Sequence, residues 1–312
     1  EYVSGGSSSI QLINLSLKGN SVLRLSGNSV LDESTIEVDN AEWQIFPDVS
    51  LGSAPHTKTL KSTSGVLNPG TITYLSDASN GANATTQANT VGFAGGEVVY
   101  NVEAGVNVDL TSETVSGSGD FVKDGAGQLL FKGGHNASTL IKAGRLNLGS
   151  GSSLADSKSV TINGGATFDL DVSDVIGSIS GTGDIELASG VTLSAGADNS
   201  STTFDGVISG DGGFTKQGTG TLIFSGAAPN AYTGATTVEA GRLNLSGGSG
   251  LADTSALSVS SGATFDLDVS DQIGALSGGG VVDLASGVTL SAGGDNSSTT
   301  FDGVISGDGG FT

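Results

Sequence analysis

Short stretches in which apolar and polar residues alternate run along most of the chain. In the run from Phe168 to Ser173, with sequence FDLDVS, the apolar side chains Phe168, Leu170 and Val172 would face one side and the polar ones the other. Such stretches last about 4 to 6 residues and are separated by Gly, Asn, Asp or Ser. No stripe of apolar residues recurs with a period of 3.6. The pattern therefore predicts an all-β chain of short strands joined by tight turns.

A 97-residue repeat organises the second half of the chain. Gly165–Ile208 and Gly262–Ile305 align without a gap, and 36 of their 44 positions are identical. Flanking motifs recur at the same offset, and the sequence stops inside a further copy, so we expect it to continue in a longer protein. The sequence thus divides into a first repeat unit (116–208), a second (209–305) and the start of a third (306–312).

A right-handed parallel β-helix, or β-solenoid, explains the short strands and the repeat together. In this fold each coil of roughly 20 residues contributes a few short strands that pair with strands directly above and below, so one repeat would comprise about five coils. A string of β-sandwich domains is the alternative, because such domains have about 100 residues. The 52 Gly residues and the lack of a Trp in each repeat favour the β-helix.

Residues 1–115 are less regular and are expected to form β-helix coils with protruding N-terminal loops. The sole Trp and three of the four Pro residues fall within residues 42–70, and a second polar run covers residues 76–89. Because proline cannot donate a ladder hydrogen bond, we expect both intervals to leave the stack. The first interval supplies the candidate contact residues, which are Trp43, His56, Lys58 and Lys61.

Charge and composition narrow the possible functions. The net charge is −21. From residue 160 onward the sequence contains 17 acidic residues and only two basic ones, Lys216 and Arg242, which gives this part a net charge of −15. Nucleic-acid binding needs Lys and Arg to replace counterions, so no nucleic-acid partner is expected. The chain has no Cys, which excludes disulfides and thiolate metal sites. No stretch approaches 18 consecutive apolar residues, so no membrane-spanning helix is expected.

Repeated carboxylates are the candidates for catalysis or metal binding. Asp169 and Asp171 lie two positions apart, at a backbone spacing of about 6.5 to 7 Å that suits paired catalytic acids. No His or Arg is near them in the sequence, and the repeat duplicates them, which indicates a structural role; no catalytic residue is assigned. Weak Ca²⁺ binding stays open, but a solvated acidic strand face is the simpler interpretation, and no cofactor or metal site is predicted. The acids concerned are Asp169, Asp171 and Asp174, with their copies Asp266, Asp268 and Asp271.

Two polar tracts, Asp198–Thr203 and Asp295–Thr300, repeat the sequence DNSSTT. A coil corner held by local side-chain hydrogen bonds is the simpler interpretation. A polar strip that binds sugars, or a like strip on another molecule, is the functional one.

Residues Gly212–Gly226 and Tyr232–Leu243 carry a longer series of motifs. A Lys-x-Gly-x-Gly-x-Leu run that starts at Lys216 is followed by Tyr-Thr-Gly and by Ala-Gly-x-Leu. The series resembles the passenger-associated transport repeat of autotransporter adhesins. An earlier copy, Gly119–Leu146, keeps Lys123 and the closing Ala-Gly-Arg-Leu, but it lacks Tyr-Thr-Gly and is four residues shorter there.

The resemblance implies a right-handed β-helix that is exported through a C-terminal outer-membrane barrel in the full-length chain, and it carries over no catalytic residue. It predicts a secreted passenger on the bacterial cell surface: a rod-like adhesin that mediates adhesion, aggregation or biofilm formation by many weak contacts. The expected partners are receptors or glycans of host or neighbouring cells, or copies of the chain itself. A self-assembling filament or surface-layer protein and a polysaccharide-degrading β-helix enzyme are the alternatives.

Overall fold

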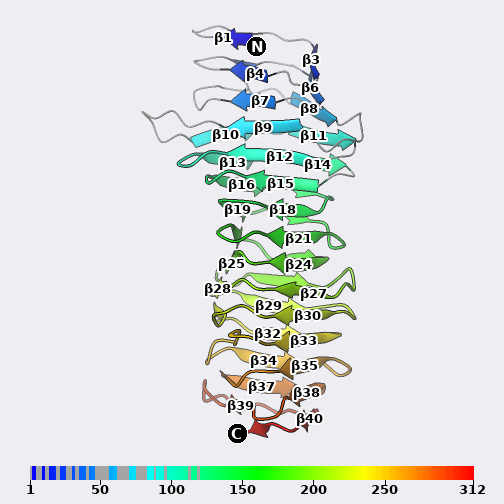
Figure 1. Cartoon of the computed structure of the whole chain (residues 1–312), viewed down its shortest axis with the longest axis vertical. Coiled ribbons are helices and arrows are strands. Elements are labelled where there is room, and N and C mark those ends of the chain that lie inside the picture. Colours follow the sequence, from blue (N-terminus) through cyan, green and yellow to red (C-terminus); the bar gives the residue numbers. More distant parts are fainter. Residues whose placement is uncertain are drawn as a thin grey trace. The chain divides into compact units, whose positions relative to one another are not determined.

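The described part of the chain is built from stacked parallel strands joined by turns. The computed structural model (Figure 1) describes residues 99–110 and 120–312 with their side chains, and for the other strand residues up to Gly117 it describes the backbone alone. Within these residues there are strands and turns but no helix. The chain forms two compact units, Glu1–Ala155 and Asp156–Thr312. The predicted all-β parallel solenoid is confirmed.

Unit 1 contains four sheets of parallel strands. The first holds β1 (Tyr2–Ser4), β4 (Val22–Leu25), β7 (Glu42–Ile45), β9 (Gly70–Tyr74), β12 (Glu97–Val102), β15 (Asp120–Asp124) and β18 (Thr139–Ile141). The second holds β10 (Asn83–Gln87), β13 (Asn107–Thr111), β16 (Gln128–Lys132) and β19 (Arg145–Leu148). The third holds β3 (Asn14–Lys18), β6 (Thr35–Asp39), β8 (His56–Lys61), β11 (Asn89–Ala94), β14 (Thr114–Gly117), β17 (Gly134–His135) and β20 (Ser153–Leu154), and the fourth holds β2 (Ser9–Ile10) and β5 (Val30–Leu31).

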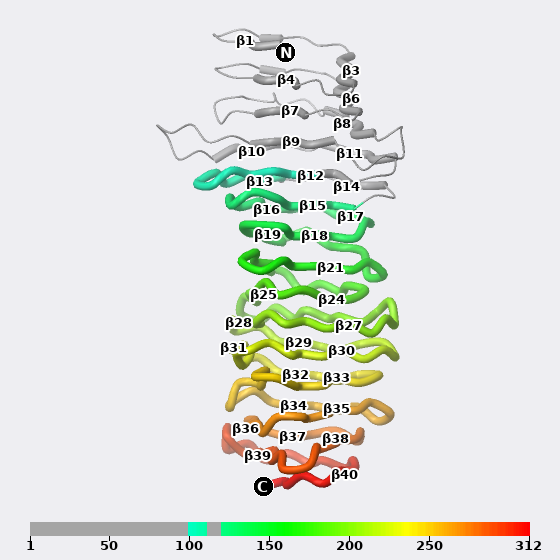
Figure 2. The backbone as a smooth tube through the Cα atoms, viewed as in Figure 1, coloured from blue at the N-terminus to red at the C-terminus, as the bar shows by residue number. Residues whose placement is uncertain are grey.

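Unit 2 also contains four sheets, and Figure 2 shows its coils lying one over another. The first sheet holds β21 (Ser159–Ile162), β24 (Ser178–Gly181), β27 (Thr202–Phe204), β30 (Thr221–Phe224), β33 (Arg242–Leu245), β35 (Thr264–Leu267), β38 (Val281–Leu284) and β40 (Val304–Gly307). The second holds β22 (Thr167–Leu170), β25 (Asp184–Leu187), β28 (Ile208–Gly210) and β31 (Ala231–Tyr232). The third holds β23 (Asp174–Ile176), β26 (Thr192–Ala195), β29 (Gly213–Lys216), β32 (Thr236–Val238), β34 (Ala256–Val259) and β37 (Ala275–Gly278). The fourth holds β36 (Asp271–Ile273), β39 (Thr289–Ala292) and β41 (Gly310–Phe311).

The core of unit 2 is a set of apolar columns inside the coils. In the first sheet, Leu222, Leu243, Phe265 and Val282 occupy successive register positions, and all four are buried. Stacking like residues directly above one another removes each from water without the wide core of a globular domain. This arrangement explains how a chain with few aromatic residues buries a continuous interior.

The alternating pattern predicted the inward residues of the strands correctly but not their ends. Phe168 and Leu170 on β22 are buried, while Asp169 between them is not. Val172 lies beyond the end of the strand and is only half-buried, because the chain turns at that point. The next inward position is taken by Asp174, which starts β23 on another sheet and is 8% exposed.

The two copies of the 97-residue repeat do not lie on the same faces of unit 2. β22 belongs to the second sheet, whereas its copy β35 belongs to the first; β24 belongs to the first sheet and its copy β37 to the third. One repeat therefore spans one face less than a whole number of coils. The prediction of five coils per repeat is too long by one face.

Strands run through both N-terminal intervals that the sequence assigns to loops. β7 and β8 lie within residues 42–70, and β10 lies within residues 76–89. The other residues of these intervals lie outside the described part, so the protruding loops stay predictions. The units divide at Ala155, inside the predicted first repeat of 116–208. The borders drawn from the sequence repeat, including those of 1–115, 209–305 and 306–312, mark sequence similarity and not compact units, so they also stay predictions.

Candidate functional site

The four predicted contact residues lie on two different sheets of unit 1. Trp43 is on β7, where it is in register with Ile72 of β9. His56, Lys58 and Lys61 are all on β8, which pairs with β6 and β11. Their side chains lie outside the described part, so a contact surface formed by these residues stays a prediction.

The repeated acids do not converge on one site. Asp266 lies on β35, Asp268 follows that strand, and Asp271 starts β36 in another sheet. Asp268 accepts a hydrogen bond from the Asn244 amide at 2.9 Å. Within the residues whose side chains are described, no group of three or more His, Cys, Asp or Glu could hold a metal ion.

Arg242 is the partner that the sequence did not reveal for these acids. Its Nη1 donates to Asp266 Oδ2 at 2.6 Å and lies 4.0 Å from Asp283 Oδ2. Arg242, Asp266 and Asp283 come from three successive strands of the first sheet, so one guanidinium links three coils. The Asp266 carboxylate thus forms an ion pair between neighbouring coils. Only knowledge of the coil register could have predicted this contact.

Asp271 is half-buried, and the pKa of its carboxyl is raised. Its Oδ2 accepts a hydrogen bond from the backbone N–H of Leu251 at 2.9 Å. Burial raises the pKa of its carboxyl to about 6, although hydrogen bonds from Leu251 and Gln272 work in the opposite direction. Asp271 therefore carries an ionised carboxylate at neutral pH at some cost in stability.

The polar tract Asp198–Thr203 is a coil corner, as its simpler interpretation predicted. Asp198 Oδ1 accepts from the backbone N–H of Ser200 at 2.9 Å, and Asn199 has a positive φ of 61°. Asn199 Oδ1 in turn accepts from the backbone N–H of Thr219 on the next coil, also at 2.9 Å. The copy has the same local turn, with Asn296 at φ 58°. Local hydrogen bonds thus explain both tracts.

A buried lysine is the centre of the Lys-x-Gly-x-Gly series. Lys216 ends β29 and is 1% exposed. Its Nζ donates to the backbone carbonyl oxygens of Gln217, Gly218 (2.9 Å) and Ala240 (3.3 Å). Burial lowers the pKa of Lys216 to about 8, and the charge of Asp198 partly opposes this shift. Because Ala240 belongs to the next coil, the ammonium joins two successive turns of the stack.

Two glycines of the same motifs permit these turns to stack. Gly218 and Gly241 have φ values of 64° and 66°, which L side chains rarely adopt. A Cβ on Gly241 would lie 2.4 Å from the carbonyl oxygen of Gly220 on the preceding coil. The glycines of Lys-x-Gly-x-Gly and Ala-Gly-x-Leu are therefore required by close backbone approach, and they do not form a nucleotide loop.

The earlier copy of the series, in unit 1, has the same lysine geometry. Lys123 is fully buried, and its Nζ donates to the carbonyl oxygens of Asp124 (2.8 Å), Gly125 (2.8 Å) and Ala143 (3.0 Å). Burial lowers its pKa to about 8, as for Lys216. The arrangement of a lysine under three carbonyls thus recurs independently in both units.

His135 occupies the place in the earlier copy that Tyr232 occupies in the later one. The Tyr232 hydroxyl lies 2.6 Å from Thr236 Oγ1, and His135 Nε2 lies 2.9 Å from Thr139 Oγ1. Both rings are buried. The sequence suggested only that the Tyr-Thr-Gly element is missing, because the copy is four residues shorter. The signal that could have found the match is a Thr four positions after a ring in both copies.

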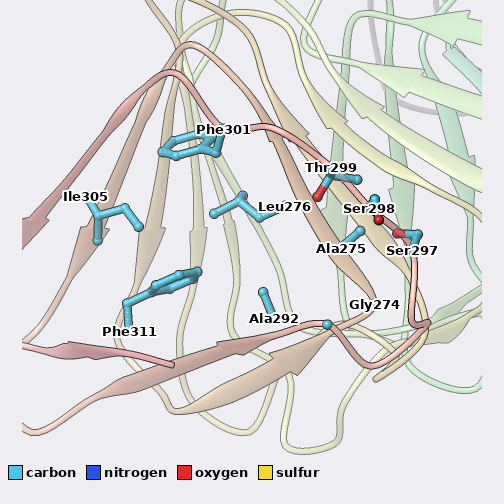
Figure 3. A pocket seen from close by; sticks show the side chains of 11 residues that line it. Gly274, Ala275, Leu276, Ala292, Ser297, Ser298, Thr299, Phe301, Ile305 and Phe311 are labelled. Atoms are coloured by element: carbon cyan, nitrogen blue, oxygen red, sulfur yellow. The ribbon is translucent and has the colours of Figure 1, made fainter.

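A cavity of about 530 Å³ opens at the last coils of unit 2 (Figure 3). Its apolar lining includes Leu276, Phe301, Ile305 and Phe311, with Ser297, Ser298 and Thr299 on one side. The residues 97 positions earlier, Ile179, Phe204, Ile208 and Phe214, are all buried core. Phe224 of a following coil covers two of them, with ring centroids 5.2 Å from Phe214 and 6.2 Å from Phe204. The cavity is therefore the counterpart of a core layer, and we assign it no ligand.

Comparison with known proteins agrees with the motif series. Residues 214–245 match the family model of the passenger-associated-transport-repeat. The chain is 32% identical over 186 residues to the adhesin BmaC autotransporter of Brucella suis biovar 1 (strain 1330), an alignment that covers 57% of this chain and 5% of that relative. No solved structure gives a significant match. In the described residues, no helical segment has the length and hydrophobicity that a membrane crossing requires. The repeat match and the similarity to this adhesin support the assignment of the chain to the passenger domains of autotransporters.

Proposed function

We propose that the chain is part of a surface-exposed autotransporter passenger that acts as a rod-like adhesin through many weak contacts. The observation that carries this proposal is the transport repeat at residues 214–245, whose buried lysine and stacked glycine turns are built into the coils. The adhesin BmaC autotransporter, to which the chain is similar, supports it. A stack of coils suits this role because each coil can present side chains to a partner, and avidity then adds up along the stack.

The proposal places the chain outside the cell, as the passenger of a longer protein with a C-terminal outer-membrane barrel. The partners are receptors or glycans on host or neighbouring cells, and adhesion, aggregation or biofilm formation would follow from such contacts. The candidate contact residues remain those on β7 and β8 of unit 1, which are Trp43, His56, Lys58 and Lys61.

We further propose that the role is non-enzymatic. The carboxylate of Asp266, one of the candidate catalytic acids, is engaged by Arg242 across the coils. A general acid or base needs its carboxyl available to a substrate, so this ion pair supports a structural use.

The proposal is tested with beads coated with the purified chain and counted on epithelial cells and on bacteria. Beads with the native chain should bind, and a Trp43→Ala/His56→Ala/Lys58→Ala/Lys61→Ala variant should bind about 10-fold less if these residues form one multivalent contact. The matched control is Asp156→Ala/Lys158→Ala, which changes exposed residues of unit 2 and should leave binding unchanged.

Three results would contradict the adhesin. The first is native beads that bind neither cell type, and the second is ordered filaments in electron micrographs of the same sample, which supports self-assembly. The third is release of sugar from a polysaccharide that stops on Asp169→Asn or Asp266→Asn, which supports the enzyme.

A further inference from the structure

The ring of His135 is held in one neutral state by its hydrogen bonds. Its Nδ1 accepts the backbone N–H of Ala137 at 3.2 Å, so this nitrogen carries no proton. The other nitrogen, Nε2, therefore carries the proton and donates it to Thr139 Oγ1 at 2.9 Å. Protonation would add a second N–H that points at the N–H of Ala137. Two donors would then face each other inside the core.

The ring is shielded from solvent and packed between aromatic side chains. His135 is 5% exposed and stacks on Phe121 with centroids 4.9 Å apart, while Phe131 meets it edge-on at 5.8 Å. Burial lowers the pKa of His135 to about 4. When the added proton of a buried group has neither water nor an acceptor, protonation favours opening of the structure around the group.

The charged groups on the elements around His135 do not favour an imidazolium. The inward one is Lys123 on β15, a cation that already holds three carbonyl oxygens. On β16, Lys132 is paired with Asp109 at 3.0 Å. The strands β17, β18 and β20 carry no acidic residue, β12 contributes Tyr100, which packs on Phe121, and Asp120 and Asp124 on β15 are not buried.

The later copy of the series provides a natural comparison. Tyr232 makes the equivalent bond to Thr236, is fully buried, and has a pKa that burial raises well above its ordinary value. A phenol in this position stays neutral from acid to mild alkali, whereas an imidazole does not. The same structural position is thus built once with a group that titrates in weak acid and once with a group that does not.

We propose that His135 is an acid-sensitive latch: protonation of its imidazole opens the corner between β17 and β18, while the equivalent corner at Tyr232 stays closed. The sign follows from proton binding. The opened form binds a proton below pH 6.5 and the closed form only below about pH 4, so closure weakens as pH falls through this window. Between pH 7 and pH 5 the opening equilibrium should shift about 20-fold.

Amide hydrogen exchange of the whole chain, corrected for intrinsic rates, measures this opening. The reporters are the amides of Phe121, which donates to Ser138 O at 2.7 Å, and of Ser153, which donates to Gly133 O at 3.0 Å. Their protection should fall about 20-fold from pH 7 to pH 5. The amide of Phe214, which makes the bond corresponding to that of Phe121, to Ala235 O at 3.0 Å, should change little, and so should that of Thr233, which follows Tyr232 and donates to Gly210 O at 2.9 Å.

Matched exchanges of the two rings complete the test. His135→Tyr should abolish the acid response at Phe121 and Ser153, and Tyr232→His should create one at Phe214 and Thr233. In the native chain, NMR titration of the His135 ring, assigned with a His56→Gln variant, should give a pKa well below 6.5 and needs no variant at position 135. Equal acid responses at both corners, an acid response that survives in His135→Tyr, or a titration at or above 6.5 would each overturn the proposal.

Discussion

At the scale of single residues, a buried lysine links neighbouring coils by donating hydrogen bonds to their backbone carbonyl oxygens; we call this arrangement a lysine clamp. Lys216 and Lys123 each place an ammonium under three carbonyl oxygens, one of which belongs to the next coil. A charged donor inside the stack is costly unless all its protons are used, and here three acceptors match its three N–H groups. The Lys-x-Gly motif is therefore explained by hydrogen bonding within the solenoid and needs no ligand.

Replacing Lys216 by Met should destabilise unit 2 by about 1–3 kcal/mol, because three carbonyl oxygens would lose their donor inside the stack. Urea denaturation of the full chain, followed by circular dichroism, measures the loss. Lys158→Met is the control, since Lys158 is exposed and its replacement should change the midpoint little. Equal midpoints for the two variants would show that the clamp contributes nothing.

Asp271 provides a prediction on pH. Its folded-state pKa of about 6 lies above the ordinary value of 3.8, so the folded chain binds more protons than the unfolded chain between these values. This residue thus adds stability as pH falls from 6 toward 3.8. Asp271→Asn, which keeps an acceptor for the Leu251 N–H, should stabilise the chain at pH 7 by about 1 kcal/mol after allowance for solvent screening. Thermal melts at pH 7 and pH 4 should show the gain at pH 7 alone; a gain of the same size at both would contradict it.

At the scale of strands and turns, the sequence pattern predicts which residues of a strand face inward but not which residues face inward at the corners between strands. Alternation located the inward residues of β22, because one face of each strand is buried and the period of a strand is two. It could not place Asp174 inward, since the chain turns between sheets there. Nor could it pair Arg242 with Asp266, because these residues are 24 positions apart and their contact depends on how the chain winds around one coil between them. Contacts between coils follow from the register, which the sequence alone does not contain.

The stacked glycine turns give a prediction at this scale. Gly241→Ala should destabilise unit 2 by about 2 kcal/mol or more, since its Cβ would meet the Gly220 carbonyl oxygen and its φ is positive. Gly262→Ala is the matched control: its φ of 88° is also positive, but nothing lies within 4 Å of its Cβ. It should cost only about 1 kcal/mol of backbone strain. If both variants had the same denaturation midpoint, close packing of the turns would not be the reason for Gly241.

At the scale of unit 2, the mismatch between repeat and coil determines where identical surfaces point. The tract Asp198–Thr203 follows β26 of the third sheet and runs into the start of β27 of the first. Its copy Asp295–Thr300 lies between β39 of the fourth sheet and the bridge from Phe301 to Gly278 on the third-sheet strand β37. Within their coils, β36 and β39 lie between a first-sheet strand and the next strand along, as β22 and β25 do in earlier coils. The two tracts therefore lie at neighbouring corners of the coil. Because one repeat spans one face less than a whole number of coils, each successive copy of a surface is rotated around the axis of the unit.

This geometry predicts that a ligand of the repeated tract approaches unit 2 from two directions. A Fab fragment raised against the DNSSTT tract should bind twice per chain, because residues 199–201 and 295–300 are exposed in both copies. In electron micrographs the two Fabs should project about 120° apart around the unit, as expected for three-sided coils shifted by one side. An Asn296→Ala/Ser297→Ala variant should bind one Fab and identify which image feature belongs to which copy. Two Fabs on the same side would mean that the repeat contains a whole number of coils. Divergent Fabs would mean that a single passenger can hold the same kind of partner on different sides, so its avidity would link separate surfaces as well as strengthen contact with one.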